Sequence, residues 1–287
     1  MIKNYKNLLD QKLSVNSYLW AHNLDPYDFL DTIKISGIKN VGLHNDFIKN
    51  VGLVKLKSYL TENKISVTSI NSIGYFTDKL AFNDYKLTLE YAKILNPDVI
   101  CVISGGLKGG PLKLRDNSIL NQKFIDPYII RKKSTDKLKF FFKETHKYQV
   151  RLGIEPIGPW EIITKGHFND IASCLKLIKN TDHKLIIDLY HSFVDINLEN
   201  FIKKSKYLGL LQFSNIKFDI NSRPIGRKKI SFPSEKNDLN IAKYLKYVFE
   251  RQDNTKIEFE IFPNDLQGND PKKIIMNLKD NILKLFI

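Results

Sequence analysis

Four successive apolar segments in the second half of the chain end in, or close to, a side chain that carries oxygen. These side chains are Glu155, Asp188, Gln212 and Glu260. The three carboxylates would repel one another if they met without a counter-charge. A divalent cation accepts several oxygen ligands and neutralises such a group. The pattern therefore predicts that these four residues bind one metal ion, with Mn²⁺, Mg²⁺ or Co²⁺ favoured by the oxygen ligands and Zn²⁺ as a further choice.

Each of these residues also has a simpler explanation when it is taken alone. Asp188 could cap a helix that starts after it, Gln212 could be a hydrogen-bonded amide of the core, and each glutamate could lie on a solvated rim or in a salt bridge. Glu258 adds an ambiguity, because strand alternation places it on the same face as Glu260. Glu260 is nearer the end of the strand and is the better ligand. We expect Glu258 one layer deeper, with a lysine or a backbone group as its partner.

These residues belong to a longer alternation of strands and helices. Apolar, β-branched runs predict strands at residues 13–19, 40–43, 65–70, 98–104, 150–155, 184–188, 207–213 and 256–262. Apolar spacings of three and four predict helices at residues 27–37, 54–63, 84–96, 135–148, 170–180, 197–205, 239–251 and 271–286. Such an alternation indicates parallel strands that are joined by crossover helices.

Eight strand–helix units in 287 residues predict one (β/α)8 barrel domain, a TIM barrel, over residues 1–287. In such a barrel the carboxyl ends of the strands carry the chemistry, which is where the four oxygen-bearing residues fall. An open doubly wound sheet is the alternative. It is disfavoured because no glycine-rich phosphate loop follows the first predicted strand.

Composition and charge narrow the classes of partner. The net charge is +14, but only six of the 45 basic residues are arginine and the lysines are scattered, which favours a solvated lysine-rich surface over a nucleic-acid interface. A basic rim that attracts an anionic substrate is the second interpretation. We find no apolar run of membrane-spanning length and no secretory signal. Cys101 and Cys174 lie in apolar runs and predict core thiols, so we expect a cytoplasmic protein without a membrane partner.

The second half of the chain resembles the xylose-isomerase-like barrel superfamily of sugar isomerases and epimerases. The resemblance follows the whole chain in order and is strongest in GIEP (153–156), IIDLYHS (186–192), LLQFSN (210–215), RPIG (223–226) and FEIFP (259–263). It implies that Glu155, Asp188, Gln212 and Glu260 are the ligands of one divalent metal ion. It also implies that His191 contacts the substrate or transfers a proton.

The resemblance implies a metal-dependent isomerase or epimerase that acts on a polyhydroxy carbonyl compound. The cation would polarise the carbonyl and stabilise an enediolate, while Glu155 and Glu260 exchange protons with the two faces of the substrate. Many sugar epimerases have histidine at the position of Gln212, and glutamine there resembles the 3-dehydroshikimate dehydratase branch. In that alternative, which includes inosose-type dehydratases, His191 is the base and the substrate loses water.

Two further alternatives follow from departures within the family. Residues 231–240 (SFPSEKNDLN) stand where the family has a Pro-Gly-x-Gly segment and lack both glycines, which is consistent with a non-catalytic sugar-binding barrel. An endonuclease branch shares the barrel but uses three metal ions and many histidines. The chain has only six histidines, few of them at strand ends, so nucleic acid is not an expected partner.

The expected substrate-binding residues lie in loops that follow the predicted strands. His44 could bind a substrate hydroxyl, and Trp160 could form an apolar wall of the site. Arg223 and Arg227 lie in the long loop after the seventh predicted strand and could clamp a carboxylate or phosphate. A plain loop histidine, a core aromatic and solvated arginines are the respective alternatives. The sequence leaves substrate identity and a possible homo-oligomer open.

Overall fold

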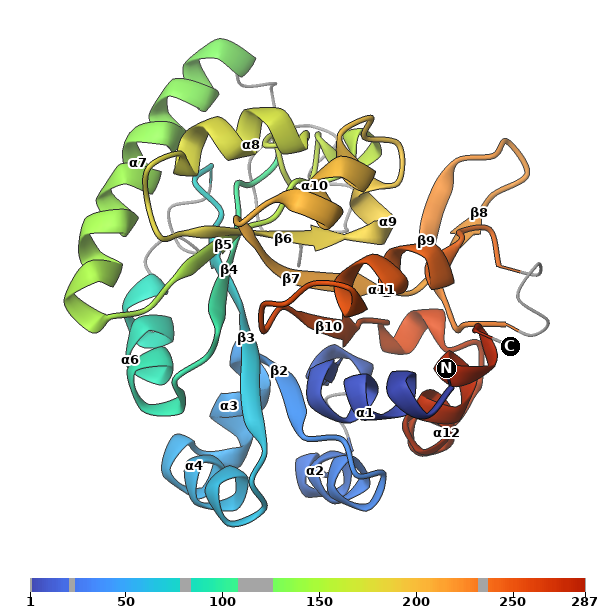
Figure 1. Ribbon diagram of the computed structural model, residues 1–287. Helices are drawn as coiled ribbons and strands as arrows, with labels where there is room; N and C mark the ends of the chain where they lie inside the picture. Colours follow the sequence, from blue (N-terminus) through green and yellow to red (C-terminus); the bar gives the residue numbers. More distant parts are fainter. Residues whose placement is uncertain (1, 21–23, 78–83, 108–125, 232–236, 287) are drawn as a thin grey trace.

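The computed structural model describes residues 2–20, 24–77, 84–107, 126–231 and 237–286. Its parallel strands close a barrel in the order β1-β10-β7-β6-β5-β4-β3-β2, surrounded by helices (Figure 1). The barrel strands are β1 (Leu13–Asn16), β2 (Asn40–His44), β3 (Ser66–Gly74), β4 (Val99–Ile103), β5 (Leu152–Ile154), β6 (Lys184–Asp188), β7 (Leu208–Phe213) and β10 (Lys256–Phe259). Each of them falls within or largely overlaps a predicted strand, so the closed barrel is confirmed and the open sheet is excluded.

Strand alternation decides which side chains face the inside of the barrel. In β4, Val99, Cys101 and Ile103 belong to a small apolar cluster with Ile186 of β6 and Leu210 of β7. The intervening residues of β4 join the larger core under the helices. Because side chains alternate along a strand, the residues two positions after Ile186 and Leu210 also face inward. These are Asp188 and Gln212, and the alternation therefore delivers both to the barrel interior.

Helices cover the outside of the barrel, and three of them begin at an Asp-Pro pair. The aspartate side chain accepts a hydrogen bond from a backbone N–H in the first turn of α2, α7 and α12, and proline takes the first helical position. The helices that match predictions are α2 (Pro26–Ile35), α4 (Leu53–Glu62), α6 (Tyr85–Leu95), α7 (Pro127–Tyr148), α8 (Ile171–Ile178), α10 (Leu198–Lys204), α11 (Ile241–Phe249) and α12 (Pro271–Lys284).

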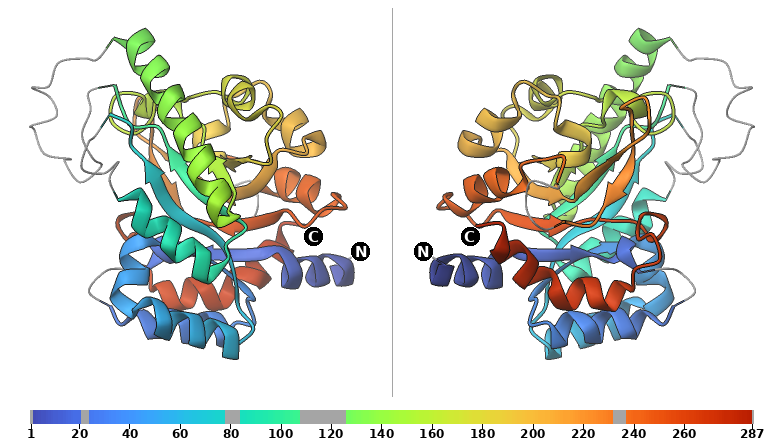
Figure 2. Two further views of the ribbon diagram at one scale, coloured as in Figure 1. Left: turned by 90° about the vertical axis from the view of Figure 1, so that its left-hand side faces the viewer. Right: turned by 90° about the vertical axis from the view of Figure 1, so that its right-hand side faces the viewer.

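Several elements were not predicted from the sequence. They are α1 (Ile2–Lys12), α3 (Asn45–Val51) and α9 (Leu189–Ser192), and a hairpin of β8 (Asn215–Phe218) and β9 (Pro224–Lys228). Helix α1 packs against α12, and the two termini lie close together in both views of Figure 2.

Among the described residues, no helix combines the length and the apolar character needed to cross a membrane.

The β8–β9 hairpin stands where the sequence suggested only a long loop. Its strands pair antiparallel, with Asn215 opposite Lys228 and Ile216 opposite Arg227. Ile216 is fully buried and fixes the base of the hairpin, which projects from the barrel in Figure 1. The pairing places Arg227 at the carboxyl end of the barrel, beside the predicted metal ligands.

Candidate metal centre

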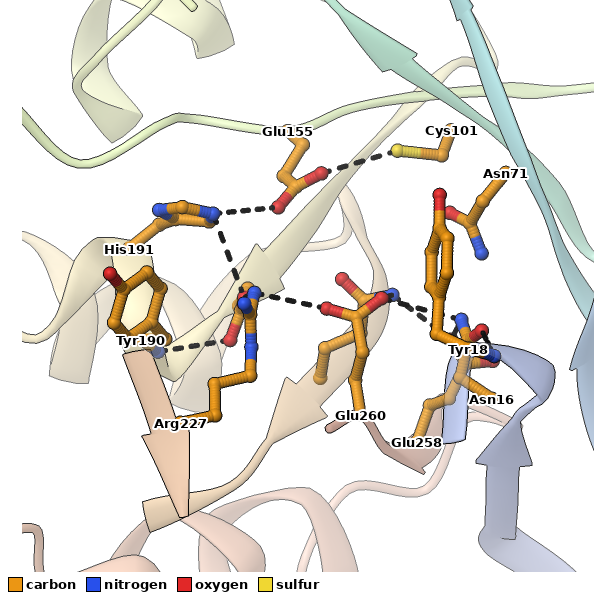
Figure 3. A network of polar contacts seen from close by, with 12 residues as sticks. Asn16, Tyr18, Asn71, Cys101, Glu155, Tyr190, His191, Arg227, Glu258 and Glu260 are labelled. Carbon is orange, nitrogen blue, oxygen red and sulfur yellow. Dashed lines mark hydrogen bonds and ion pairs between the residues drawn. The ribbon is translucent and has the colours of Figure 1, made fainter. Parts of the chain in front are cut away.

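The four predicted metal ligands lie at the carboxyl ends of adjacent strands. Glu155 directly follows β5, Asp188 ends β6, Gln212 lies near the end of β7 and Glu260 directly follows β10. Asp188 pairs in register with Gln212, so these residues lie at the same height in the barrel. All four are at most 5% exposed. Figure 3 shows Glu155, Glu260, His191 and Arg227 converging on one region.

The two oxygens of Asp188 have different partners. Oδ1 accepts a hydrogen bond of 2.9 Å from the backbone N–H of Tyr190 and caps α9. Oδ2 faces the cluster, 3.8 Å from Nε2 of His191 and in contact with Nη2 of Arg227. The helix-cap explanation and the cluster explanation are therefore both satisfied, each by a different oxygen.

Arg227 lies at the centre of the cluster and bridges two carboxylates. Its Nη2 donates to Oδ2 of Asp188 and to Oε2 of Glu260, the latter at 3.1 Å. The guanidinium lies between aromatic rings, with its central carbon 4.5 Å from the ring centre of Tyr190 and 4.7 Å from that of Phe262. The side chain that was expected to clamp an anionic substrate group therefore pairs with two of the predicted metal ligands.

His191 joins the cluster through its Nε2 atom. This atom lies 3.6 Å from Oε1 of Glu155 and 2.8 Å from Nζ of Lys165. Nδ1 of the same ring is buried and has no hydrogen-bond partner among the described residues. Burial, followed by the positive charges of Lys165 and Arg227, holds the pKa of His191 well below its ordinary value. Glu155, Asp188 and His191 offer atoms within 4.8 Å of one another, a spacing that suits a metal ion.

Glu258 lies one layer deeper, as expected, but its expected partner was wrong. No lysine or backbone donor binds it among the described contacts. Its carboxylate instead accepts from neutral side chains of β1, β3 and β7, at distances from 2.6 to 3.4 Å. These donors are Ser14, Asn16, Thr68, Ser69 and Gln212. Closure of the barrel between β1 and β10 brings most of them to the carboxylate.

Glycine at position 42 makes room for the Glu258 carboxylate. A Cβ atom at Gly42 would lie 2.3 Å from Oε2 of Glu258, closer than real contacts allow. The backbone of β2 can therefore approach the carboxylate only without a side chain. The deep carboxylate is thus enclosed by backbone and neutral donors, and it supports Gln212 from below through a hydrogen bond of 2.9 Å.

The charges of the cluster leave room for a divalent cation. Four buried carboxylates, Glu155, Asp188, Glu258 and Glu260, face two buried cations, Arg227 and Lys165. With every group ionised, the cluster carries two negative charges more than positive ones. Burial is the main cause that raises the pKa of Glu155 and that of Glu260, the latter to about 8. Negative charge on the neighbouring Asp188 raises both further.

An unpaired buried oxygen atom also favours a bound divalent cation. Gln212 donates through Nε2 to Glu258 and Glu260, whereas its buried Oε1 has no partner among the residues the structure describes. Buried polar atoms are rarely left unpaired. By chemical type, the free amide oxygen and the carboxylates of Glu155, Asp188 and Glu260 suit a divalent metal ion, whereas the group with atoms within 4.8 Å of one another is Glu155, Asp188 and His191.

The other expected substrate-binding residues are His44, Trp160 and Arg223, and each has local contacts of its own. His44 ends β2, caps α3 through Nδ1 and packs against Tyr18, with 4.6 Å between the ring centres. Trp160 follows β5 and packs against Tyr190 and Phe193. Arg223 lies in the exposed turn of the β8–β9 hairpin, where it pairs with Asp219 at 2.7 Å.

Sequence reasoning missed two residues of the cluster region. Lys165 is buried in the loop after β5, and no strand-end position or motif marked it. Tyr18 lies in a short 3-10 helix after β1, because the side chain of Asn16 accepts from the N–H of Tyr18 and ends the strand there. Burial raises the pKa of Tyr18 well above its ordinary value, with Tyr75 and Glu260 as further causes, so its phenol stays a neutral donor. Residues 232–236, in the segment that lacks the family's glycines, lie outside the described residues.

Comparison with known proteins agrees with this geometry. The family model described as xylose isomerase-like TIM barrel matches residues 36–278. The chain belongs to this family. A search of curated proteins finds no significant sequence match. The expectation from the sequence motifs is therefore confirmed at the level of fold and family.

Solved structures of low sequence identity share the fold over almost the full chain. IolI with a bound zinc atom has a TM-score of 0.71 at 16% identity and covers 96% of this chain and 97% of its own. The 3-keto-D-glucoside 4-epimerase YcjR from E. coli has a TM-score of 0.69 at 15% identity, covering 96% and 99%. The probable 3-DHS dehydratase AsbF from Bacillus anthracis has a TM-score of 0.67 at 14% identity, covering 94% and 97%. At these identities the likeness establishes the fold alone.

Proposed function

We propose that this protein is a divalent-metal-dependent isomerase or epimerase of a sugar or related hydroxy-ketone. The observation that carries the proposal is the buried group of Glu155, Asp188, Gln212 and Glu260, which has an unpaired amide oxygen. When every group is ionised, these residues together with Glu258, Arg227 and Lys165 carry an excess of two negative charges. A bound divalent cation supplies Lewis acidity, which acidifies the C–H bond next to a substrate carbonyl. Two solved structures that share the fold support this choice, since one is a 3-keto-D-glucoside 4-epimerase and the other, IolI, has a bound zinc atom.

Glu155 and Glu260 are suited to transfer protons on two sides of a substrate. β5 and β10 are separated by β6 and β7 in the barrel, so the two carboxyl groups enter the site from different directions. Burial raises the pKa of both carboxyl groups, and the pKa of Glu260, about 8, allows this group to hold a proton near neutral pH. Arg227 and Lys165 provide positive charge next to the carboxylates, and the neutral phenol of Tyr18 is available to donate to a substrate oxygen.

A dehydratase is the second candidate, and the state of His191 favours it. Burial lowers the pKa of His191, so the neutral ring can take a proton from carbon at Nε2 after Nζ of Lys165 moves away, and it can return that proton to the neighbouring hydroxyl, which leaves as water. The fold similarity to the probable 3-DHS dehydratase AsbF is consistent with this reaction. Ultraviolet absorbance separates the two candidates, because loss of water next to a carbonyl gives a conjugated product and epimerisation does not.

The direct test combines metal analysis with hydrogen exchange. Purified protein supplemented with Mn²⁺ should bind about one equivalent. In D₂O it should then introduce deuterium next to the carbonyl of at least one member of a panel of ketohexoses, ketopentoses, keto-glucosides and their phosphates. Metal binding without exchange or dehydration of any substrate would favour a non-catalytic sugar-binding barrel. Failure to bind Mn²⁺, Co²⁺, Mg²⁺ or Zn²⁺ would contradict the proposal.

Metal affinity should rise with pH up to about 8. Glu260 has a raised pKa of about 8 because it is buried, so a metal ion must displace its proton below that pH. The same shift makes the metal-free fold lose stability as pH rises from about 4.5 to about 8, because the unfolded chain ionises first. Calorimetric Mn²⁺ titrations at pH 6, 7 and 8 should show affinity increasing by up to about tenfold per unit. Glu260→Gln should flatten this dependence, and an equal slope in that variant would contradict the assignment.

A further inference from the structure

We propose that Arg227 is a built-in competitor of the metal ion. Its guanidinium binds Asp188 and Glu260, and a divalent cation that binds these carboxylates competes with it for the same oxygens. The proposal rests on the metal site proposed above and adds that the site is closed by a side chain of its own hairpin.

The hydrogen bonds of the two carboxylates show where competition must occur. Oδ1 of Asp188 is committed to the cap of α9, and only Oδ2 faces the cluster, where Arg227 holds it. The two oxygens of Glu260 also have separate partners. Oε1 accepts from Gln212 at 3.2 Å and from Asn16 at 3.4 Å. Its Oε2 is the oxygen that Nη2 of Arg227 binds at 3.1 Å.

One nitrogen therefore occupies the bridging position between two carboxylate oxygens. A metal ion that takes both ligands needs these same oxygens, and two cations on one oxygen repel each other strongly in a site with few exposed groups. Both carboxylates are at most 5% exposed, so water cannot screen the repulsion well. A metal–carboxylate bond at either oxygen therefore weakens the pair that the same oxygen forms with Arg227.

Arg227 can lose these contacts without leaving the site. Its guanidinium stacks between Tyr190 and Phe262, and these contacts do not depend on the carboxylates. The side chain is 4% exposed, and its Nε has no hydrogen-bond partner among the described residues. The stacked guanidinium therefore keeps unused donors in the site. Arg227 belongs to β9, so replacement of its carboxylate contacts by a metal ion should also affect the β8–β9 hairpin.

The test compares Mn²⁺ affinity in four proteins by calorimetry at pH 7 and pH 8. Arg227→Met removes the competitor and should bind Mn²⁺ at least about tenfold more tightly than wild type. Arg227→Lys keeps a positive charge and should stay close to wild type. Arg223→Met is the matched control, because it removes an exposed arginine of the same hairpin that pairs with Asp219, and its affinity should equal that of wild type.

A second measurement covers the case in which Arg227→Met does not fold without metal. That variant is then purified with Mn²⁺, and release to a chelator should be at least about tenfold slower than from wild type. Equal or weaker binding by Arg227→Met, or equal or faster release, would overturn the proposal and show that Arg227 supports the ligands. If wild type binds no metal and Arg227→Met does, competition stands and the metal-dependent function fails. If neither binds, both proposals fail.

Discussion

Glu260→Gln should slow exchange of the substrate proton with solvent by about 10²- to 10⁴-fold, the range expected when a positioned acid–base group is removed. Glutamine preserves the size of the side chain and one oxygen, but it cannot carry a proton between substrate and solvent. The variant also removes a negative charge from a predicted metal ligand and should weaken metal binding. Deuterium incorporation at saturating Mn²⁺ measures the first effect separately from the second.

A surface glutamate provides the control for this change. Glu144 pairs with Lys147 at 2.6 Å on the outer helix α7, away from the strand ends. Glu144→Gln removes the same charge from the chain and should leave the exchange rate within about a factor of two, since exposed ion pairs contribute little. If Glu260→Gln keeps more than about a third of the wild-type rate, the carboxyl group of Glu260 does not transfer the proton.

Replacing Glu258 by leucine should destabilise the fold by about 3 to 5 kcal/mol. The carboxylate is fully buried and accepts from five side chains, which would face an apolar group in the variant. Each buried donor that loses its acceptor costs about 1 to 3 kcal/mol, and partial re-pairing, such as that between Ser14 and Thr68, reduces the sum. Urea unfolding followed by circular dichroism measures the loss.

Glu258→Gln is the matched variant for this prediction. It keeps one acceptor oxygen and the volume of the side chain, but it turns an amide N–H₂ toward donors, so its loss should be intermediate. A loss below about 1 kcal/mol for Glu258→Leu would mean that the donors find other partners and that the deep carboxylate does not organise the barrel interior. Glu258→Leu should also affect the predicted metal site, because the predicted ligand Gln212 loses one of its two acceptors.

The sequence predicted those parts of the site that depend on the position of a residue along its own strand. Glu155, Asp188 and Glu260 stand at strand ends, and parallel strands in a barrel bring their carboxyl ends together. Asp188 faces inward because Ile186, two residues earlier, faces inward. The positions of residues along their own strands were therefore enough to predict both the fold and the ligand set.

The sequence could not predict contacts that arise only from pairing across the molecule. The donors to Glu258 come from β1, β3 and β7, and no pattern within β10 indicates them. Arg227 reaches Asp188 through a hairpin whose short strands contain proline and glycine and show no clear alternation. Lys165 reaches His191 from a loop without regular structure. In each case the decisive information is spatial register, which a single sequence does not show.

Anomalous X-ray diffraction from crystals grown with Mn²⁺ tests the central claim most directly. We predict one strong peak at the carboxyl ends of β5, β6, β7 and β10, with oxygens of Glu155, Asp188, Gln212 and Glu260 within about 2.0 to 2.6 Å of it. Arg227 should then no longer bind both Oδ2 of Asp188 and Oε2 of Glu260. Crystals that show no peak there, with the carboxylates still closed on the guanidinium, would contradict the account.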